Sequence, residues 1–153
     1  MSDAVDSIEA LVRLHEGRRL RCYDDATGAE LRPGDTLRGH PTIGIGRALD
    51  RRGIDDEEAD WLFARDILEA RRAVVAAIPW SAGLDVVRRA VLVDMSFNLG
   101  IRGLVGFRRM LAALELRDYE TAAAEMLFSK WATQVGPRAR RLATMMEHGQ
   151  WPT

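Results

Sequence analysis

The first apolar pattern of the chain has the spacing of a helix. Apolar residues recur at intervals of one, three and four at Ala4, Ile8, Leu11 and Val12. Gly17 follows as a natural helix stop. The pattern therefore predicts a first helix that ends at Glu16.

Between residues 18 and 47 the pattern changes to short β-prone pieces. These pieces, "RLRCYDDATG", "ELRPGDTLRG" and "HPTIGIGR", are separated by glycine, proline and aspartate, which favour turns. The stretch predicts a small antiparallel hairpin or meander.

Helical patterns return at Asp55, which forms a capping box with Glu58. A continuous apolar stripe follows at Ala59, Leu62, Phe63, Ile67, Ala70, Val74 and Ala77. It predicts a long helix over 55–78, stopped by Pro79. A second helix, beginning from Ser81 and apolar on nearly every side, is expected to end at Gly100. Shorter helices are predicted around 104–114, 118–129 and 138–147.

These elements predict an α+β fold in one domain over 1–153. A small antiparallel β lobe occupies about 18–54, and a larger helical lobe takes about 1–17 and 80–153. The helix at 55–78 connects them. We expect a groove between the lobes, because ligand sites commonly lie at such junctions.

Composition narrows the class of protein. The 153 residues are 47% hydrophobic and carry a net charge of −1, which disfavours a nucleic-acid binder, as does the acidic run "DDEEAD". A single cysteine, Cys22, allows no disulfide framework and no Cys-x-x-Cys metal site. The charged N-terminal stretch predicts neither a signal peptide nor a membrane span, and hence a cytoplasmic protein.

Carboxylates gather near the first predicted helix. Glu16 at a helix C-terminus faces the negative end of the helix dipole, a setting that suits a general acid. On spacing alone, a surface glutamate without a role is the commoner interpretation. Of Asp24 and Asp25, only one can face the groove, because strand side chains alternate, and the other is expected to cap the turn. The Thr42 hydroxyl could hold a water molecule, but a threonine here is equally typical of any half-buried strand.

Polar groups in the helical half are the next candidates. Asp94 and Asn98 lie one turn apart on an apolar helix and must find partners or line the groove. Arg138 can pair with an acid or contact a substrate, and Trp131 is the best tryptophan for lining a groove. His15 and His40 are too isolated for a metal site, so a surface or turn role is favoured for both.

Two carboxylates, a hydroxyl and an arginine are the parts that glycoside hydrolysis needs, although their spacing alone makes it only possible.

Several motifs occur in an order that resembles a known family. The stretches "LHEGRRLRCYDD", "TIGIGR", "RRAVLVDMSFNLG", "GLVGFRRML" and "SKWATQVGPRARR" are similar to the T-even phage lysozymes of glycoside hydrolase family 24, over roughly residues 8 to 151. The resemblance implies a lysozyme-like α+β fold. It also implies a phage endolysin, a muramidase that cleaves the β-1,4 bond between N-acetylmuramic acid and N-acetylglucosamine in peptidoglycan, without a cofactor or metal.

The resemblance also implies roles for residues. Glu16 would be the acid, Asp25 the carboxylate on the opposite side of the sugar, and Thr42 the holder of the attacking water. An inverting reaction of this kind needs roughly 6.5–9.5 Å between the two carboxyl groups. Arg138 would pair with Glu16, and Phe97, Asn98 and Trp131 would contact the substrate.

The chain departs from the family pattern around the catalytic residues. The segment 26–41 between Asp25 and Thr42 has 16 residues, more than T-even lysozymes have, and should form a lengthened hairpin over the cleft. The segment after Gly46 is shorter. Arg47 occupies the place of a histidine, so the histidine–aspartate pair of some relatives is not expected here.

Two alternatives to hydrolysis stay open. One is a lysozyme-like domain that binds cell-wall glycan without cutting it, and the other is a lytic transglycosylase. The expected partner is the peptidoglycan glycan strand, with no nucleic acid, and the expected state is a monomer. By the resemblance, the protein would accumulate in the host bacterial cytoplasm and depend on a separate holin-type protein to reach the wall.

Overall fold

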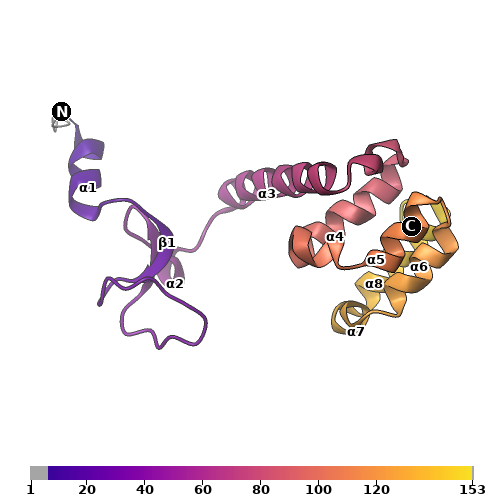
Figure 1. The fold of residues 1–153 in the computed structure, drawn as a ribbon. Coiled ribbons are helices and arrows are strands. Elements are labelled where there is room, and N and C mark those ends of the chain that lie inside the picture. The colour runs from indigo at the N-terminus through magenta and orange to yellow at the C-terminus, as the bar shows by residue number, and fades with distance from the viewer. Residues whose placement is uncertain (1–6, 153) are drawn as a thin grey trace. The chain divides into compact units, whose positions relative to one another are not determined.

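The computed structural model describes residues 7–152, so Ala4 of the predicted first helix lies outside the described residues. The contacts divide the chain into two compact units, Met1–Ala59 and Asp60–Thr153 (Figure 1). The assignment of residues 1–17 to the helical lobe stays a prediction.

The N-terminal unit begins with helix α1 (Ile8–Glu16). The Ser7 hydroxyl accepts a hydrogen bond from the Ala10 N–H at 3.1 Å and so caps the start of the helix. Gly17 ends it with a φ of 69°, a left-handed conformation that glycine adopts at little cost, and its N–H donates to the Arg13 carbonyl. The predicted helix end at Glu16 is confirmed. No residue of α1 is buried.

A three-stranded antiparallel sheet follows, formed by β1 (Arg19–Asp24), β2 (Pro41–Gly44) and β3 (Arg47–Ala48) in that spatial order. Thr42 in the central strand pairs with Tyr23 on one side and Ala48 on the other. The predicted antiparallel meander is therefore confirmed. A one-turn helix that was not predicted, α2 (Leu49–Arg52), comes directly after β3 and ends at Gly53.

The segment between β1 and β2 contains only a minimal hairpin. The Asp24 N–H donates to the Ala29 carbonyl, and the Leu31 N–H donates to the Cys22 carbonyl, both at 2.9 Å. Tyr23 and Glu30 form one isolated bridge between these bonds. The rest of the segment up to residue 40 has no strand. The lengthened hairpin is thus shorter than expected, and most of the 16 residues form a loop.

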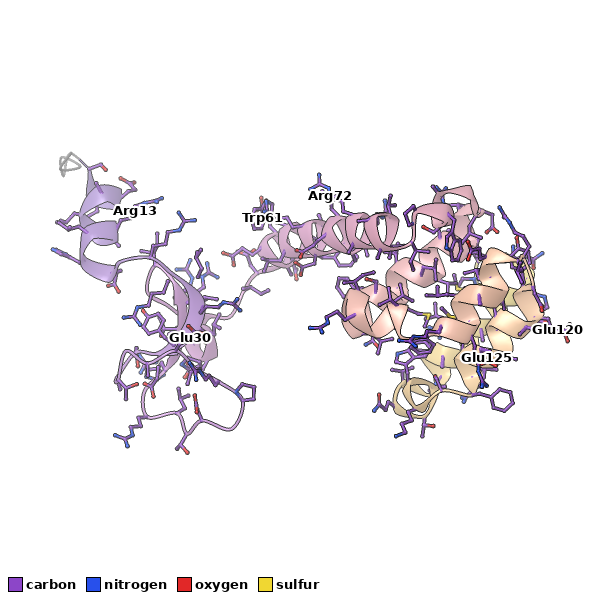
Figure 2. The ribbon with its side chains drawn as sticks, viewed as in Figure 1. Arg13, Glu30, Trp61, Arg72, Glu120 and Glu125 are labelled. Carbon is purple, nitrogen blue, oxygen red and sulfur yellow. The ribbon has the colours of Figure 1, made fainter. Side chains whose placement is uncertain are left out.

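The long helix α3 (Asp56–Ala77) agrees with the prediction over 55–78. Its capping box is complete: Asp55 Oδ1 accepts the Glu58 N–H at 2.9 Å, and Glu58 Oε2 accepts the Asp55 N–H at 3.1 Å. It stops before Pro79, because proline disfavours the helical conformation in the residue that precedes it. Figure 2 shows Trp61 and Arg72 projecting from one side of α3.

The C-terminal unit continues with a short 3₁₀ helix and five α-helices. These are η1 (Pro79–Gly83), α4 (Val86–Val105), α5 (Arg108–Glu115), α6 (Tyr119–Leu127), α7 (Lys130–Val135) and α8 (Pro137–His148). Helix α6 packs against α5 and α8, and α4 packs against α8. Their fully buried side chains include Leu92, Met95, Leu104, Met110, Leu114, Met126 and Met146, which form the core.

The helices of this unit differ from the prediction at the start of α4, at the start of α5 and at α7. Helix α5 begins at Arg108 rather than around residue 104, because α4 continues to Val105. Helix α4 begins at Val86 rather than near Ser81, because Asp85 Oδ1 accepts the Arg88 N–H at 2.9 Å and caps the helix there. Gly100, the expected stop, does interrupt the helix, with a φ of 72°. Helix α7 lies between the helices predicted around 118–129 and 138–147 and was not predicted.

The described residues form a mainly helical chain with one small antiparallel sheet, which confirms the predicted α+β class. Within residues 7–152 no single helix is long and apolar enough to cross a membrane. Helices α4 and α5 reach that length and composition only as a pair bent by 98°.

Candidate functional site

Asp25 and Thr42 are joined through the backbone of His40. Asp25 Oδ1 accepts the His40 N–H at 2.6 Å, and the Asp25 N–H donates back to the His40 carbonyl at 3.1 Å. The Thr42 hydroxyl donates to the same carbonyl at 3.1 Å. Two of the three predicted catalytic residues are therefore held around one residue, at the junction between β1 and β2.

The neighbouring Asp24 is the aspartate that organises the loop. Its side chain is only 2% exposed, and its carboxylate accepts the backbone N–H groups of Arg38, Ala26 and Gly39 at 2.7–2.9 Å. These bonds, with that from Arg38 the largest, lower the pKa of Asp24. Asp24 thus fastens both ends of the loop and leaves the exposed Asp25 beside it as the aspartate available for chemistry.

Thr42 is almost completely buried, with 3% of its surface exposed. Because its hydroxyl hydrogen is used in the bond to His40, the lone pairs of Oγ1 are left to accept a hydrogen bond. A threonine in this state can orient a water molecule that donates to it.

Glu16 is the last residue of α1 and is exposed. Its carboxylate lies against Gly46, in the turn between β2 and β3: a Cβ atom placed on Gly46 would stand 2.6 Å from Glu16 Oε2. The C-terminal end of α1 therefore lies close to the sheet at Gly46, where the absence of a side chain leaves room for the Glu16 carboxylate. All three predicted catalytic residues belong to the N-terminal unit.

Arg47 forms an ion pair with Glu58 of α3. It donates to both carboxylate oxygens of Glu58, at 2.5 and 2.6 Å, and to the Gly53 carbonyl at 2.8 Å. A bidentate arginine–carboxylate pair fixes both side chains in one geometry. Arg47 thus ties β3 to the start of α3.

The ring of His40 also has a defined partner, which the sequence did not reveal. Its Nδ1 lies 2.7 Å from Asp50 Oδ2 in α2, and the two side chains are 31% and 41% exposed. The hydrogen bond from His40 lowers the pKa of Asp50. The sequence analysis favoured a surface or turn role for His40 and did not predict its contact with Asp50. The only available sign that His40 belongs to the site was its position two residues before Thr42.

In the C-terminal unit, Arg138 pairs with Asp94. Its Nε and Nη2 lie 2.9 and 2.8 Å from Asp94 Oδ1, so Asp94 has found the partner that its place on an apolar helix demanded. Arg138 is thus held by an acid of α4. Its predicted pairing with Glu16 stays a prediction.

Asn98 and Trp131 are also joined directly. The Trp131 indole N–H donates to Asn98 Oδ1 at 2.8 Å, which leaves the Asn98 amide N–H groups available to a ligand. Trp131 is buried in α7 and packs edge-on against Phe107, with ring centroids 5.9 Å apart. Phe97 is 44% exposed and packs edge-on against Phe63.

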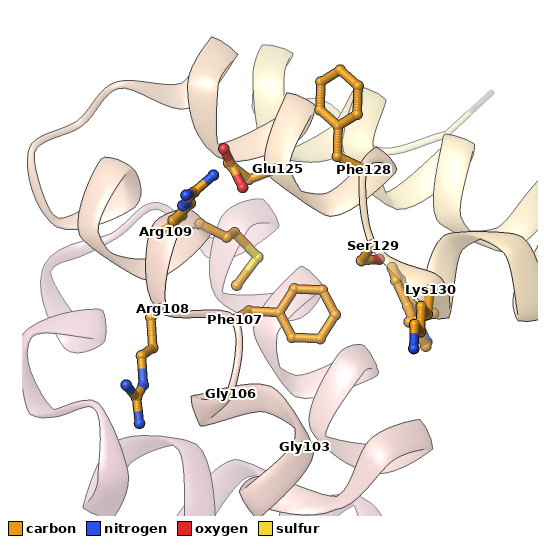
Figure 3. Close-up of a pocket in the computed structure, with 11 residues that line it drawn as sticks. Gly103, Gly106, Phe107, Arg108, Arg109, Glu125, Phe128, Ser129 and Lys130 are labelled. Atoms are coloured by element: carbon orange, nitrogen blue, oxygen red, sulfur yellow. The ribbon is translucent and has the colours of Figure 1, made fainter.

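Two pockets of the C-terminal unit are lined by some of these residues, although Asn98 lines neither. One, of about 570 Å³, is lined by Trp131 and Phe107, with basic groups from Arg108, Arg109 and Lys130 (Figure 3). The other, of about 670 Å³, has among its lining residues Phe97, Asp94, Arg138, Phe63 and Trp151. Among the described residues, no three histidine, cysteine or acidic side chains come together in a way that could hold a metal.

Comparison with known proteins gives a family for the chain. The family described as phage lysozyme matches residues 13–148, which include Glu16, Asp25, Thr42 and the four candidate residues of the C-terminal unit. The chain belongs to the phage lysozyme family. Its function is accordingly lysozyme-like.

Individual relatives are distant but cover nearly the whole chain. Probable T4-type lysozymes 1 and 2 of Dictyostelium discoideum are 25% and 24% identical, each over 95% of this chain and 96% of their own length. The pre-baseplate central spike protein Gp5 of Enterobacteria phage T4 is 27% identical over 94% of this chain. The matched part is 28% of that spike protein.

Proposed function

We propose that the protein is an endolysin that hydrolyses the β-1,4 bond between N-acetylmuramic acid and N-acetylglucosamine in bacterial peptidoglycan. The observation that carries the proposal is the joint attachment of Asp25 and Thr42 to His40, in a unit that also contains Glu16. An exposed carboxylate beside a hydroxyl with free lone pairs suits the activation of water.

In this proposal Glu16 donates a proton to the glycosidic oxygen as the bond to the sugar breaks. A water molecule, whose hydrogen is accepted by Thr42 Oγ1, attacks the anomeric carbon from the opposite face and gives up a proton to Asp25. The result is a single displacement with inversion. It requires the two carboxyl groups to stand roughly 6.5–9.5 Å apart, so that the water fits between them.

The proposed substrate contacts come from the C-terminal unit. The Asn98 amide donates to a sugar acetamide or hydroxyl, because its oxygen is already occupied by Trp131. Phe97 offers an exposed ring face, and Arg138, held by Asp94, offers its remaining guanidinium N–H groups.

The main experiment replaces Glu16 with glutamine, which has nearly the same shape but cannot donate a proton as an acid does. We expect the loss of turbidity of a peptidoglycan suspension to slow by at least about 100-fold. Glu9→Gln, in the first turn of the same helix, is the matched control and should lyse at the wild-type rate. Undiminished lysis by the Glu16 variant would refute its role as the acid.

The products distinguish hydrolysis from the transglycosylase alternative. Hydrolysis adds water and creates a new reducing end, whereas a lytic transglycosylase leaves an anhydro sugar lighter by one water. Mass spectrometry of soluble fragments measures this difference. Proton NMR of the first-formed product should show the α anomer if the β bond is cleaved with inversion.

A second candidate is a domain that binds wall glycan without cutting it. The observation that favours it is the similarity to one part of a phage spike protein, because the name of that protein describes a structural component and not an enzyme. A binding domain would sediment with peptidoglycan and release no reducing ends, and Asp25→Asn would leave that binding unchanged.

We also propose a cellular setting. The protein acts as a monomer, accumulates in the host bacterial cytoplasm and reaches the wall after a separate holin-type protein permeabilises the membrane. Expression alone should leave cells intact, and addition of a membrane-permeabilising agent should cause lysis. Lysis without that agent would contradict this dependence.

A further inference from the structure

His40 contacts two of the residues to which the proposed function assigns the activation of water. Its N–H donates to Asp25 Oδ1, and its carbonyl accepts both the Asp25 N–H and the Thr42 hydroxyl. A displacement of this one backbone segment would therefore move the carboxylate and the hydroxyl together.

The backbone of His40 is fixed on both sides along the chain. The Gly39 N–H before it donates to Asp24 Oδ1 at 2.9 Å. Pro41 after it begins β2 and restricts the backbone of His40 to extended conformations. Gly39 also lies so close to Ala26 that a Cβ atom there would stand 2.7 Å from the Ala26 Cβ. The segment consequently runs in tight contact with the turn that holds Asp25.

The His40 side chain supplies the third point of attachment. Its Nδ1 lies 2.7 Å from Asp50 Oδ2, on the first turn of α2. Helix α2 follows β3 directly, and β3 pairs with β2 through Thr42 and Ala48. The ring therefore links the start of β2 to the helix that follows the neighbouring strand β3, so that Thr42 lies between this link and the pairing of β2 with β3.

We propose that His40 is a positioning residue for glycan hydrolysis, with Asp50 holding its ring so that its backbone keeps Asp25 and Thr42 in place. This inference rests on the proposed function. Because Nδ1 faces Asp50, this ring nitrogen is not available to the substrate.

The partial exposure of the pair makes the proposal distinguishable from a purely structural role. A hydrogen bond between two side chains as exposed as these contributes little to folding stability. A shift of about 1 Å in a catalytic group, in contrast, can lower the rate about 100-fold. Loss of the pair should thus reduce kcat far more than it reduces the amount of folded protein.

The test measures kcat and KM on soluble uncrosslinked glycan strands for His40→Ala, His40→Asn and Asp50→Ala. We expect His40→Ala and Asp50→Ala to lower kcat by about 10- to 100-fold while KM changes less than about twofold. His40→Asn should recover most of kcat, because its amide nitrogen can occupy nearly the place of Nδ1 and donate to Asp50. The exposed His148→Ala and Asp60→Ala serve as matched controls and should match the wild type.

The double variant His40→Ala/Asp50→Ala separates a pair from two independent effects. If the two side chains act as one unit, the double variant should be about as slow as either single variant. Multiplied losses, wild-type kcat in His40→Ala, or no recovery in His40→Asn would each overturn the proposal.

A spectroscopic measurement tests the same geometry without catalysis. The short bond to a carboxylate should place the His40 amide proton far downfield in ¹⁵N-labelled protein, and Asp50→Ala should shift it upfield. An unchanged resonance would overturn the link between ring and backbone. A wild-type protein that cuts no glycan would refute the proposed function, whereas an active wild type with an equally active His40→Ala would refute only the positioning role.

Discussion

The Glu16 carboxylate and Gly46 are in direct contact. An added Cβ atom on Gly46 would stand 2.6 Å from Oε2 and 2.9 Å from Cδ of Glu16, closer than such atoms approach in proteins. Gly46 also has a φ of 68°, which favours glycine. The glycine therefore serves both the turn between β2 and β3 and the placement of the proposed acid.

Replacement of Gly46 with alanine should displace the Glu16 side chain. The left-handed backbone alone costs roughly 1–2 kcal/mol in the free energy of unfolding. We expect glycan hydrolysis to fall by a further tenfold or more, about the effect of moving a catalytic group. Steady-state kinetics with the folded fraction measured by circular dichroism separates the two effects.

Gly53→Ala is the matched control for this experiment. Gly53 has a similar φ of 60°, but a Cβ atom there would meet only the Leu49 carbonyl, at 4.0 Å. Its replacement should cost similar stability and leave the hydrolysis rate per folded molecule unchanged. Equal rates in the two variants would contradict a role for the contact between Glu16 and Gly46.

Asp24 should make the folded protein sensitive to acid. The backbone N–H groups of Arg38, Ala26 and Gly39 hold its pKa below the ordinary aspartate value of about 3.9. The stabilisation is therefore fully present above that value and is lost as the pH falls through the lower pKa of the folded state. Thermal unfolding midpoints of the wild type and Asp24→Asn, measured from pH 7 to pH 2, should converge as the pH falls.

The exposed Asp60→Asn is the control and should follow the wild type at every pH. In Asp24→Asn, the introduced amide also turns an N–H toward one of the backbone donors, so that variant should unfold at a lower temperature at neutral pH. A difference between wild type and Asp24→Asn that stayed constant down to pH 2 would contradict the argument.

Arg88 should be a main stabilising residue of the C-terminal unit. It is 9% exposed, donates to the Met146 and Glu147 carbonyls near the end of α8 at 2.7 and 2.6 Å, and stacks 3.5 Å from the Tyr119 ring centroid. Arg88→Met would leave these carbonyls without their donor. We expect a loss of about 2–4 kcal/mol in the free energy of unfolding, measured by urea titration.

The adjacent Arg89→Met provides the comparison. Arg89 is exposed, so its replacement should change the free energy of unfolding by less than about 0.5 kcal/mol. Hydrogen exchange should show faster opening of the last turn of α8 in the Arg88 variant alone. Similar stabilities of the two variants would contradict the assignment.

The longer elements could be predicted from the sequence because local signals define their ends. Gly17 ends α1, the Asp55–Glu58 capping box begins α3, and Gly100 interrupts α4. Helix α7 was missed although it carries equivalent signals on a shorter stretch. The Ser129 hydroxyl accepts the Ala132 N–H at 3.1 Å, and Gly136 ends the helix. A helix of about one and a half turns shows too little periodicity for the pattern to reveal it.

The contacts of the site were less predictable than its residues. The notion that one of Asp24 and Asp25 caps the turn followed from strand alternation, and Asp24 does so. The pairing of His40 with Asp50 did not follow, because the two residues are ten positions apart and the path of β2 and β3 between them is not specified by the sequence. The pairing of Arg138 with Asp94 was not predicted either, because it depends on how α8 packs against α4.

The bond between Trp131 and Asn98 gives a final prediction about substrate binding. Trp131→Phe keeps an aromatic ring beside Phe107 but removes the indole N–H that fixes the Asn98 amide. Free to rotate, the amide should present its donors to the glycan less often. We expect KM for soluble glycan to rise about threefold to tenfold with kcat nearly unchanged, as befits the loss of one hydrogen bond.

Asn98→Asp tests the same step from the other side. Its carboxylate still accepts the indole N–H but has no N–H to offer the glycan, so KM should rise by a similar factor. The exposed Trp61→Phe is the control and should leave KM at the wild-type value, because Trp61 stacks only against Arg65 among the described contacts of its ring. A fall in kcat at constant KM would instead place Asn98 and Trp131 in the chemical step, since contacts made equally before and during bond breaking change KM alone.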